Sequence, residues 1–358
     1  EVVANIKSLD EILAMLFALL TAWFAAKGND EHRTRYTLLG GLSFFLALTA
    51  KENAITFLAI VPLVVWYTTK DLKRCAVQFG ALLLPAFGYF LLRSVALGPE
   101  PQVAWVDDFL TNPFHGATVS DHLATAALIF IRYIKLLLFP WPLTTDYYPP
   151  MIPIVGWGDP RAMLGALLLI SACVFGIAGM RKRNMVGFGL LWFVITYSVV
   201  SNVFINLGTP MNDRFLFMPS AGFAVVLATL FAWALERVRS SLAMGIARSL
   251  IALVLVGFAA QTFSRNHDWR DDLTLFAHDV TVSDKSARCH VMYAKLLVET
   301  AGRTRDEPQK NRQLSDALKH LERGLSIYPD YALAHGLLGK LAMDRADYHA
   351  ATDHFIAC

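Results

Sequence analysis

Eight long apolar runs constrain the fold of this chain more than any other feature. They cover residues 9–26, 36–50, 54–69, 75–92, 163–180, 185–203, 215–235 and 242–263. A helix that crosses a bilayer needs about 20 apolar residues, and within lipid its backbone polar groups must be satisfied inside the segment. The pattern therefore predicts an all-α, multi-pass membrane domain of about eight spans over residues 1–263.

Basic residues in the connections between these runs predict the orientation. By the positive-inside rule, connections rich in Lys and Arg face the cytoplasm. Eight spans then begin and end on the opposite side, so residues 264–358 are expected in a periplasm or a lumen. The basic connections contain Lys27, Arg33 and Arg35; Lys70, Lys73 and Arg74; Arg181, Lys182 and Arg183; and Arg237 and Arg239.

Two stretches fit this map less simply. Residues 121–140 are apolar, but Arg132 and Lys135 interrupt them. Counting them as a span would put residues 181–183 outside, so we expect a helix in the outer leaflet whose charges snorkel or line a cavity. The short runs 36–50 and 54–69 flank Lys51-Glu52-Asn53. They predict a hairpin with this triplet at its tip, or else one long kinked helix, and the hairpin is favoured.

The charged tail, residues 264–358, has no spanning run and resembles tetratricopeptide repeats. Two repeats are predicted, at about 287–330 and 331–358, the second incomplete, with a polar loop inserted at 303–311. In the first, Ala317, Leu321 and Gly324 fill small and apolar slots. In a 34-residue unit beginning at Ala332, the aromatic slots are filled by His335, Tyr348 and Phe355. The slots for Leu, Gly and Ala are filled by Leu338, Gly339 and Ala351.

The outer face carries the candidate binding residues. Asn212-Asp213-Arg214 stands at the outer start of a span. It either marks the helix end or lets Arg214 bind an anionic headgroup such as a lipid phosphate, which a planar guanidinium suits. Lys51 and Glu52 form either a self-satisfied ion pair or part of a polar cavity.

A long outer segment, about residues 93–161, is rich in Pro, Trp and Tyr, as is typical of an interfacial and functional loop. Within it lies Asp146-Tyr147-Tyr148. Asp146 is either a turn residue, the favoured reading, or an acceptor for sugar hydroxyls. The outer face also offers carboxylates for general-base work, and the sequence does not select among Glu1, Asp10, Glu11, Asp107 and Asp108.

Several classes of function lack support. The outer-face histidines show no metal-binding spacing, and no nucleotide-binding loop, GxSxG elbow or nucleic-acid module is present. The four cysteines show no CxxC pair, and unpaired thiols are favoured over a Cys289–Cys358 bridge.

Five stretches together resemble the transmembrane and tetratricopeptide repeat-containing O-mannosyltransferases and their bacterial relatives, within the GT-C superfamily. They are residues 1–13, 49–56 around Lys51-Glu52, 137–148, 213–222 and 264–287. The resemblance implies that a polyprenyl- or dolichyl-phosphate-linked sugar, mannose in that family, is transferred to Ser or Thr of a protein acceptor presented by the repeats. It implies no resident cofactor and leaves a divalent metal open.

The resemblance also implies site residues. Arg214, with Asn212 and Asp213, would lie at the lipid phosphate, whereas Asp146, Tyr147, Tyr148, Lys51, Glu52 and Glu1 would line the sugar or its cavity. The family's catalytic acid lies in a first outer loop, which we expect before residue 1, in a protein of which this chain is a piece. An inverting displacement is implied.

Two other functions remain open. One is a non-catalytic membrane anchor that presents the repeats as a scaffold for proteins; the other is a polysaccharide ligase or polymerase. The sequence contains no Asn-x-Ser/Thr sequon, which mildly favours a bacterial inner membrane with the repeats in the periplasm over an endoplasmic reticulum membrane with lumenal repeats.

Overall fold

The computed structural model describes residues 2–27, 33–98, 110, 112 and 114–358, and helices dominate this part of the chain. No β-strand occurs in it, which confirms the all-α prediction. The membrane domain contains α1 (Leu9–Lys27), α2 (Arg33–Ala50), α3 (Phe57–Thr69), α4 (Leu72–Leu97), α5 (Val119–Leu138), α6 (Pro160–Lys182), α7 (Met185–Ser198), α8 (Phe217–Arg237) and α9 (Ser241–Asp268).

Six helical segments of the described chain are long and apolar enough to cross a membrane: Ile6–Lys27, Glu52–Thr69, Leu72–Leu97, Pro160–Lys182, Asp213–Arg237 and Ser241–Asp268. The other two expected spans form shorter or less apolar helices, α2 and α7. Helix α7 ends at Ser198, before the predicted end at residue 203. It stops there because Asn202 takes a left-handed conformation (φ 56°) and its side chain binds the loop at Leu207, Thr209 and Pro210.

Helices α1 to α4 form one packed group, in which α1 and α4 each lie against both α2 and α3. The chain leaves helical conformation at Lys51 (φ −157°, ψ 137°) and continues as the short 3-10 helix η2 (Glu52–Thr56). Residues 36–50 and 54–69 are therefore two helices and not one kinked helix, and the polar triplet lies between them.

Helices α5 to α8 pack in sequence order, each against the next, and α7 also contacts α3. Where α7 meets α8, a Cβ on Gly222 would lie 2.5 Å from the carbonyl oxygen of Gly189. Only glycine permits so close an approach of two helices. This crossing fixes the start of α8, which is preceded by the 3-10 helix η3 (Asp213–Leu216).

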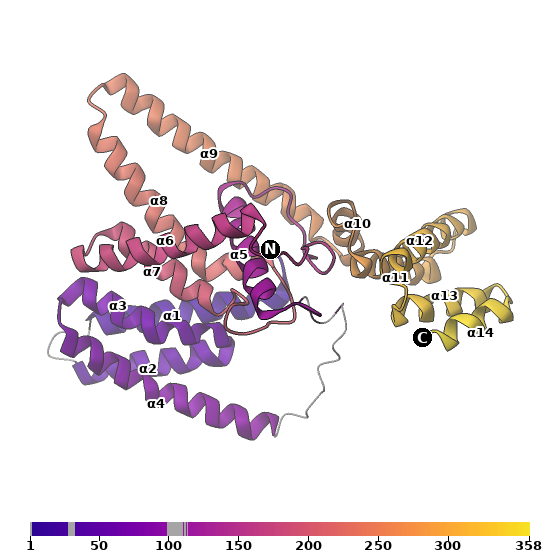
Figure 1. Ribbon diagram of the computed structural model, residues 1–358, viewed down its shortest axis with the longest axis horizontal. Helices are drawn as coiled ribbons and strands as arrows, with labels where there is room; N and C mark the ends of the chain where they lie inside the picture. The colour runs from indigo at the N-terminus through magenta and orange to yellow at the C-terminus, as the bar shows by residue number, and fades with distance from the viewer. Residues whose placement is uncertain (1, 28–32, 99–109, 111, 113) are drawn as a thin grey trace.

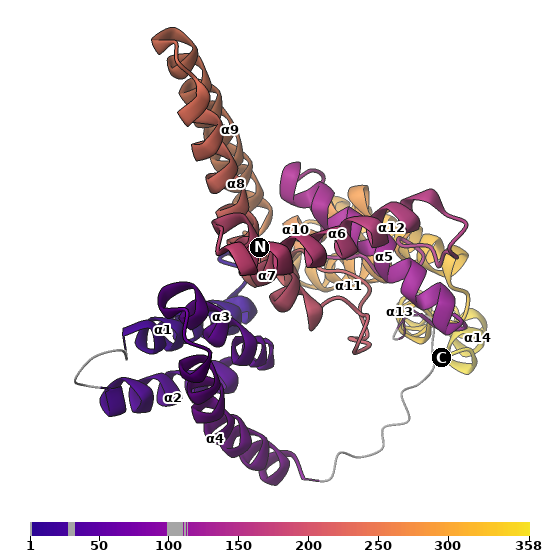
Figure 2. The ribbon, with the colours of Figure 1, turned by 60° about the vertical axis from the view of Figure 1, so that its left-hand side comes forward.

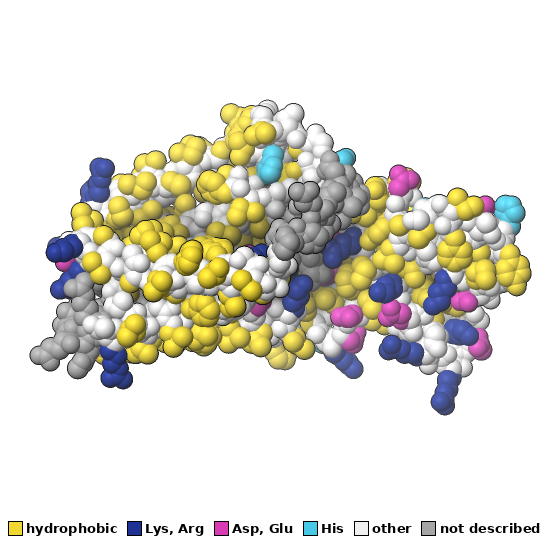
Figure 3. Space-filling view, turned by 90° about the horizontal axis from the view of Figure 1, so that it is seen from below, with side chains coloured by type: hydrophobic (Ala, Val, Ile, Leu, Met, Phe, Trp, Pro, Cys, Tyr) yellow, Lys and Arg dark blue, Asp and Glu magenta, His cyan; other side chains and the backbone are white. Residues whose placement is uncertain are grey.

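Helices α8 and α9 project beyond the other helices as an arm (Figure 2). The apolar window of α9 has no buried residue, so its surface is available to lipid. Three connections, α3–α4, α6–α7 and α8–α9, lie at the end of the membrane domain away from the tail (Figure 1). Lys and Arg side chains also gather at that end, and hydrophobic side chains cover the flank of the helices (Figure 3).

The tail contains α10 (Asp272–Val282), α11 (Ala287–Arg303), α12 (Glu307–Ile327), α13 (Ala332–Asp344) and α14 (Tyr348–Ile356). Helices α11 and α12 pair, as do α13 and α14, in the manner of tetratricopeptide repeats. A Cβ on Gly339 would lie 2.7 Å from the Phe355 ring, which explains the need for glycine in that slot.

One tail prediction is wrong. Residues 303–311 are not a loop, because α12 already begins at Glu307. Asp306 caps it by accepting a hydrogen bond from the backbone N–H of Gln309 at 3.2 Å. The thiols Cys75, Cys173, Cys289 and Cys358 are all free, as expected.

Candidate functional site

A cavity of about 520 Å³ brings together five of the residues singled out from the sequence: Asp10, Lys51, Glu52, Tyr148 and Arg214. We call it the Arg214 cavity. It lies where the ends of α2 and α4 meet the loop before η3. Its walls are Asp10, Leu48, Thr49, Ala50, Lys51, Glu52, Asn53, Tyr89, Tyr148, Val200, Leu207, Thr209, Arg214 and Phe215.

Lys51 connects α2 to the beginning of α1. Its Nζ lies 3.1 Å from Oδ2 of Asp10 and 2.7 Å from Oε1 of Glu11. Glu11 is only 1% exposed, so its charge depends on this partner. The Lys51 ammonium is therefore paired with two carboxylates: that of Asp10, which lines the cavity, and that of Glu11, which is buried behind the cavity wall. The pairing of Lys51 with Glu52 considered from the sequence is not the arrangement found.

Glu52 instead forms an ion pair with Arg93 of α4, and Tyr89 also binds the Arg93 side chain. This pair joins the α2–α3 connection to the end of α4. Glu52 remains largely exposed at 61% of its side chain and lines the Arg214 cavity. Its carboxylate can thus accept a hydrogen bond from a molecule in the cavity without losing Arg93.

Arg214 presents a half-buried guanidinium to the cavity. Its Nε is buried and has no hydrogen-bond partner among the residues that the structure describes. No carboxylate of those residues lies within 4.0 Å of it, although its charge acts on Glu11. A buried donor without a partner is costly, so the site favours an anion with oxygen acceptors.

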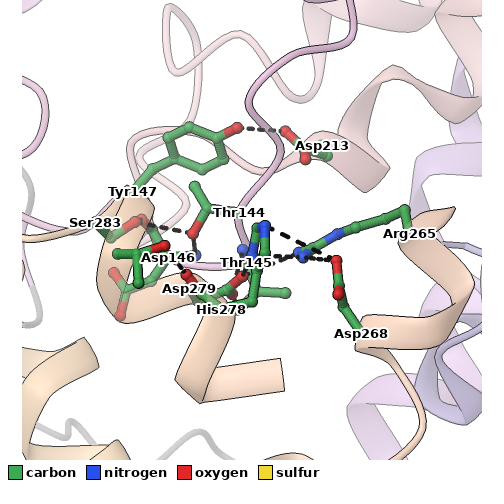
Figure 4. A network of polar contacts seen from close by, with 11 residues as sticks. Thr144, Thr145, Asp146, Tyr147, Asp213, Arg265, Asp268, His278, Asp279 and Ser283 are labelled. Atoms are coloured by element: carbon green, nitrogen blue, oxygen red, sulfur yellow. Dashed lines mark hydrogen bonds and ion pairs between the residues drawn. The ribbon is translucent and has the colours of Figure 1, made fainter. Parts of the chain in front are cut away.

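The two residues before Arg214 hold the loop and do not line the cavity. The backbone N–H of Asn212 donates to the hydroxyl of Tyr133 at 2.9 Å, and the Asn212 side chain caps η3 by accepting from the N–H of Arg214. Asp213 accepts a 2.6 Å hydrogen bond from the hydroxyl of Tyr147 (Figure 4). Both side chains thereby position Arg214.

Asp146 does not line the Arg214 cavity. It is 4% exposed, and its Oδ1 accepts a hydrogen bond from the backbone N–H of Tyr148 at 2.9 Å, which forms a local turn. Burial raises the pKa of this carboxyl, against the opposing effects of the Tyr148 N–H and the Arg288 charge. These contacts are those of a turn residue.

The loop around Asp146 is joined to the tail by a buried polar network (Figure 4). The hydroxyl of Ser283 donates to the Asp146 carbonyl oxygen at 2.8 Å. Asp279, which is fully buried, accepts two bonds from Thr145 and pairs with Arg265 at 3.0 Å. A change in the position of α10 would therefore be transmitted to this loop.

Tyr148 links the cavity to the first repeat. Its side chain lines the Arg214 cavity, and the guanidinium of Arg288, at the start of α11, lies 4.2 Å from its ring centroid. Such a cation–π contact is favourable at this distance. The tail thus touches the cavity through one aromatic ring.

Three of the remaining sequence candidates cannot be placed. Glu1, Asp107 and Asp108 fall outside the described residues. Within the described chain, no three His, Cys, Asp or Glu side chains gather as a metal site would require. Tyr147 faces a different cavity, discussed below.

Sequence reasoning missed Tyr89 and Thr209 as cavity residues. Tyr89 stands alone in an apolar run, and only the spacing of four residues to Arg93 could have linked the two side chains. Nothing local marks Thr209. Asp10 was noticed as an outer carboxylate, but its proximity to Lys51, 41 residues away, depends on the packing of α1 against α2.

These features define a multi-pass helical membrane protein with a polar cavity at one end and a helical-repeat tail. No known family profile matches the chain, and no solved structure matches it. Several curated proteins, however, are similar to it in sequence. Its homologues are the TMTC-type protein O-mannosyl-transferases, which are 25–30% identical over most of the chain.

Three of these relatives show the extent of the similarity. A Caenorhabditis elegans Protein O-mannosyl-transferase, F38B6.6, is 25% identical over 338 residues, or 92% of the chain and 44% of its own length. Mouse TMTC4 is 27% identical over 85% of the chain and 46% of its own length. Mouse TMTC1 is 30% identical over 64% of the chain and 24% of its own length. The chain thus spans less than half the length of each.

Proposed function

We propose that the chain is part of a membrane glycosyltransferase that transfers a sugar, most simply mannose, from a polyprenyl- or dolichyl-phosphate donor to Ser or Thr of a protein. The observation that carries this proposal is the Arg214 cavity. It joins a guanidinium that has no carboxylate partner among the described residues to carboxylates and tyrosines. The names of the homologues support the same activity.

In this proposal, Arg214 binds the phosphate of the donor lipid, because its planar fork of donors matches phosphate oxygens. The acceptor hydroxyl oxygen attacks the anomeric carbon while the bond from that carbon to the phosphate oxygen breaks. A carboxylate takes the hydroxyl proton, and the lipid phosphate leaves. Arg214 stabilises the negative charge that develops on the leaving phosphate.

The chain itself supplies binding groups. Tyr148 and Glu52 would contact the sugar hydroxyls, and Lys51 would hold Asp10 at the wall. The base is not assigned to a residue of this chain. The repeats would present the acceptor on the face opposite the basic connections, in a periplasm or a lumen.

The decisive experiment uses the full-length protein in membranes. Transfer of radiolabelled mannose from polyprenyl-phosphate-mannose to protein is measured for the parent, Arg214→Ala, Arg214→Lys and the control Arg239→Gln, an exposed residue between α8 and α9. We expect a loss of about 100-fold in Arg214→Ala, as for removal of one donor to a developing anion. Arg214→Lys should retain part of the rate, and the control all of it.

Two outcomes separate the parts of the proposal. Full transfer by Arg214→Ala would show that Arg214 does not bind the donor phosphate, but the proposed transferase activity would stand. No transfer by the parent, with mannose or another lipid-linked sugar, would favour a membrane-anchored scaffold that binds proteins through its repeats.

A further inference from the structure

A second cavity, of about 530 Å³, lies against α5 and shares no lining residue with the Arg214 cavity. We call it the α5 cavity. It is formed by α5, the loop that follows it and the start of α6, together with Met211 from the loop before η3 and Val282 at the end of α10. Its lining residues are mainly apolar or aromatic. The exceptions are the hydroxyls of Thr144 and Tyr147 and three cations, Arg132, Lys135 and Arg161.

The positive charge of this cavity is only partly neutralised. Arg161 forms a bidentate pair with Asp159, with an Nη2–Oδ2 distance of 2.7 Å. Among the described residues, Arg132 donates one long bond, of 3.4 Å, to the carbonyl oxygen of Met151. Within the described chain, neither Arg132 nor Lys135 has a carboxylate within 4.0 Å, and no acid lines the cavity.

Arg132 and Lys135 are three residues apart on α5, so they lie on the same face of the helix. Arg132 is half-buried and Lys135 is exposed. A guanidinium that is partly desolvated and lacks a counterion is unfavourable. The half-buried guanidinium of Arg132 and the exposed ammonium of Lys135 on the next turn together form a place for an anion that bridges them.

The mouth of the cavity indicates what kind of anion it takes. Trp141, at the rim, is 58% exposed, and the neighbouring Leu138 and Phe139 are 55% and 69% exposed. Exposed Trp beside cations is typical of the headgroup level of a membrane. A water-soluble anion would leave this apolar surface uncovered, whereas the acyl chains of a lipid would cover it.

We propose that the α5 cavity binds the phosphate headgroup of an anionic glycerophospholipid, with its acyl chains against Leu138, Phe139 and Trp141. Arg132 contacts the phosphate with its fork, and Lys135 adds a point charge. The bound lipid holds α5 to the loop that carries Tyr147 and Tyr148. This inference does not rest on the proposed transferase activity.

The test is native mass spectrometry of the full-length protein in detergent with added phosphatidylglycerol or phosphatidylcholine. We expect a preference for phosphatidylglycerol of about tenfold or more, because both cations attract the net negative charge that phosphatidylcholine lacks. The Arg132→Gln/Lys135→Gln variant should lose this preference, and the control Arg239→Gln should keep it. Trp141→Ser should reduce retention of both lipids, which provides a readout if the double variant folds poorly.

Equal retention of the two lipids by the parent would overturn the proposal, as would an unchanged preference in the double variant. Two competitors test the source of the phosphate. Displacement of phosphatidylglycerol by an equal concentration of polyprenyl phosphate would assign the cavity to that lipid instead. Displacement by the same concentration of inorganic phosphate would show that the lipid chains do not contribute. Either of these two displacements would also overturn the proposal.

Discussion

The hydroxyl of Tyr147 donates a 2.6 Å hydrogen bond to Oδ1 of Asp213, across 66 residues of sequence (Figure 4). It joins the loop after α5 to the 3-10 helix that carries Arg214. Tyr147 faces the α5 cavity and Tyr148, its neighbour, faces the Arg214 cavity. Two adjacent tyrosines therefore stand between the two anion-binding candidates.

Tyr147→Phe should weaken this link while leaving the ring in place. A bond to a charged acceptor contributes roughly 1.5–3 kcal/mol, so the midpoint of thermal unfolding should fall measurably. Mannose transfer should fall as well, because Arg214 loses a support. Tyr348→Phe, at an exposed tail residue, is the matched control. An unchanged midpoint in Tyr147→Phe would show that the bond does not stabilise the loop.

Lys51→Met should be among the most destabilising changes in the membrane domain. It leaves the buried carboxylate of Glu11 without its partner at 2.7 Å. Loss of one member of a buried ion pair costs about 3–5 kcal/mol. The double variant Lys51→Met/Glu11→Leu should recover much of this loss, measured by thermal unfolding in detergent. A double variant no better than Lys51→Met would mean that Asp10, and not Glu11, is the partner that matters.

Asp146→Asn distinguishes a turn residue from a sugar-binding residue. Because burial raises the pKa of Asp146, the folded state holds its proton more tightly than the unfolded state. Its contribution to stability is therefore present at low pH and lost as the pH rises through the folded-state pKa. The asparagine has no charge and its Oδ1 can still accept from the N–H of Tyr148. Unfolding at neutral pH should occur at an equal or higher temperature, and transfer should continue. A stable variant without transfer would favour the contact to sugar.

A histidine pair should make the first repeat sensitive to acid. His290 and His320 meet with an Nδ1–Nδ1 distance of 2.9 Å, and Nε2 of His290 lies 2.9 Å from the carbonyl oxygen of Asp284. Because a carbonyl oxygen only accepts, His290 carries its proton on Nε2 and donates it to Asp284. Nδ1 of His290 is then an acceptor, so Nδ1 of His320 donates to it. Burial lowers the pKa of both rings, and the neighbouring His290 lowers that of His320 further.

The direction in which stability changes with pH follows from these pKa shifts. The stability that the pair contributes is present above the unfolded-state pKa of about 6.5 and is lost as the pH falls towards the lower folded-state values. Hydrogen exchange of peptides from residues 287–327 should therefore be faster at about pH 5.5 than at about pH 7.5, after correction for the intrinsic rate. His320→Phe should reduce the pH dependence. Exchange that is independent of pH in the parent would contradict the prediction.

The same geometry recurs in the second repeat, where His335 and His354 meet with an Nδ1–Nδ1 distance of 3.1 Å and Nε2 of His335 lies 2.8 Å from the carbonyl oxygen of Pro329. The sequence placed His335 in the aromatic slot of the repeat. It did not indicate a partner, because the partner comes from the other helix of the pair.

Much of the fold was predictable, because its signals are local. An apolar run of about 20 residues has few structures open to it in lipid, and Gly339 and Ala351 mark a repeat because small residues allow paired helices to approach. For the interrupted run, the sequence left open whether Arg132 and Lys135 snorkel or line a cavity, and the structure shows that they line one. The boundary errors came from capping, as at Asp306, and from the loop held by Asn202.

The sequence by itself therefore determined that the chain is helical and crosses a membrane, that a repeat tail follows, and that Arg214 and Lys51 stand at helix ends. Only the tertiary structure decided which polar side chains share a cavity. It placed Lys51 beside Asp10 and Glu11, and Glu52 beside Arg93. It also buried Asp146 and placed the next two residues, Tyr147 and Tyr148, in the walls of different cavities. The reason is physical: hydropathy acts along the chain, whereas these contacts join residues far apart in sequence and exist only once the helices have packed.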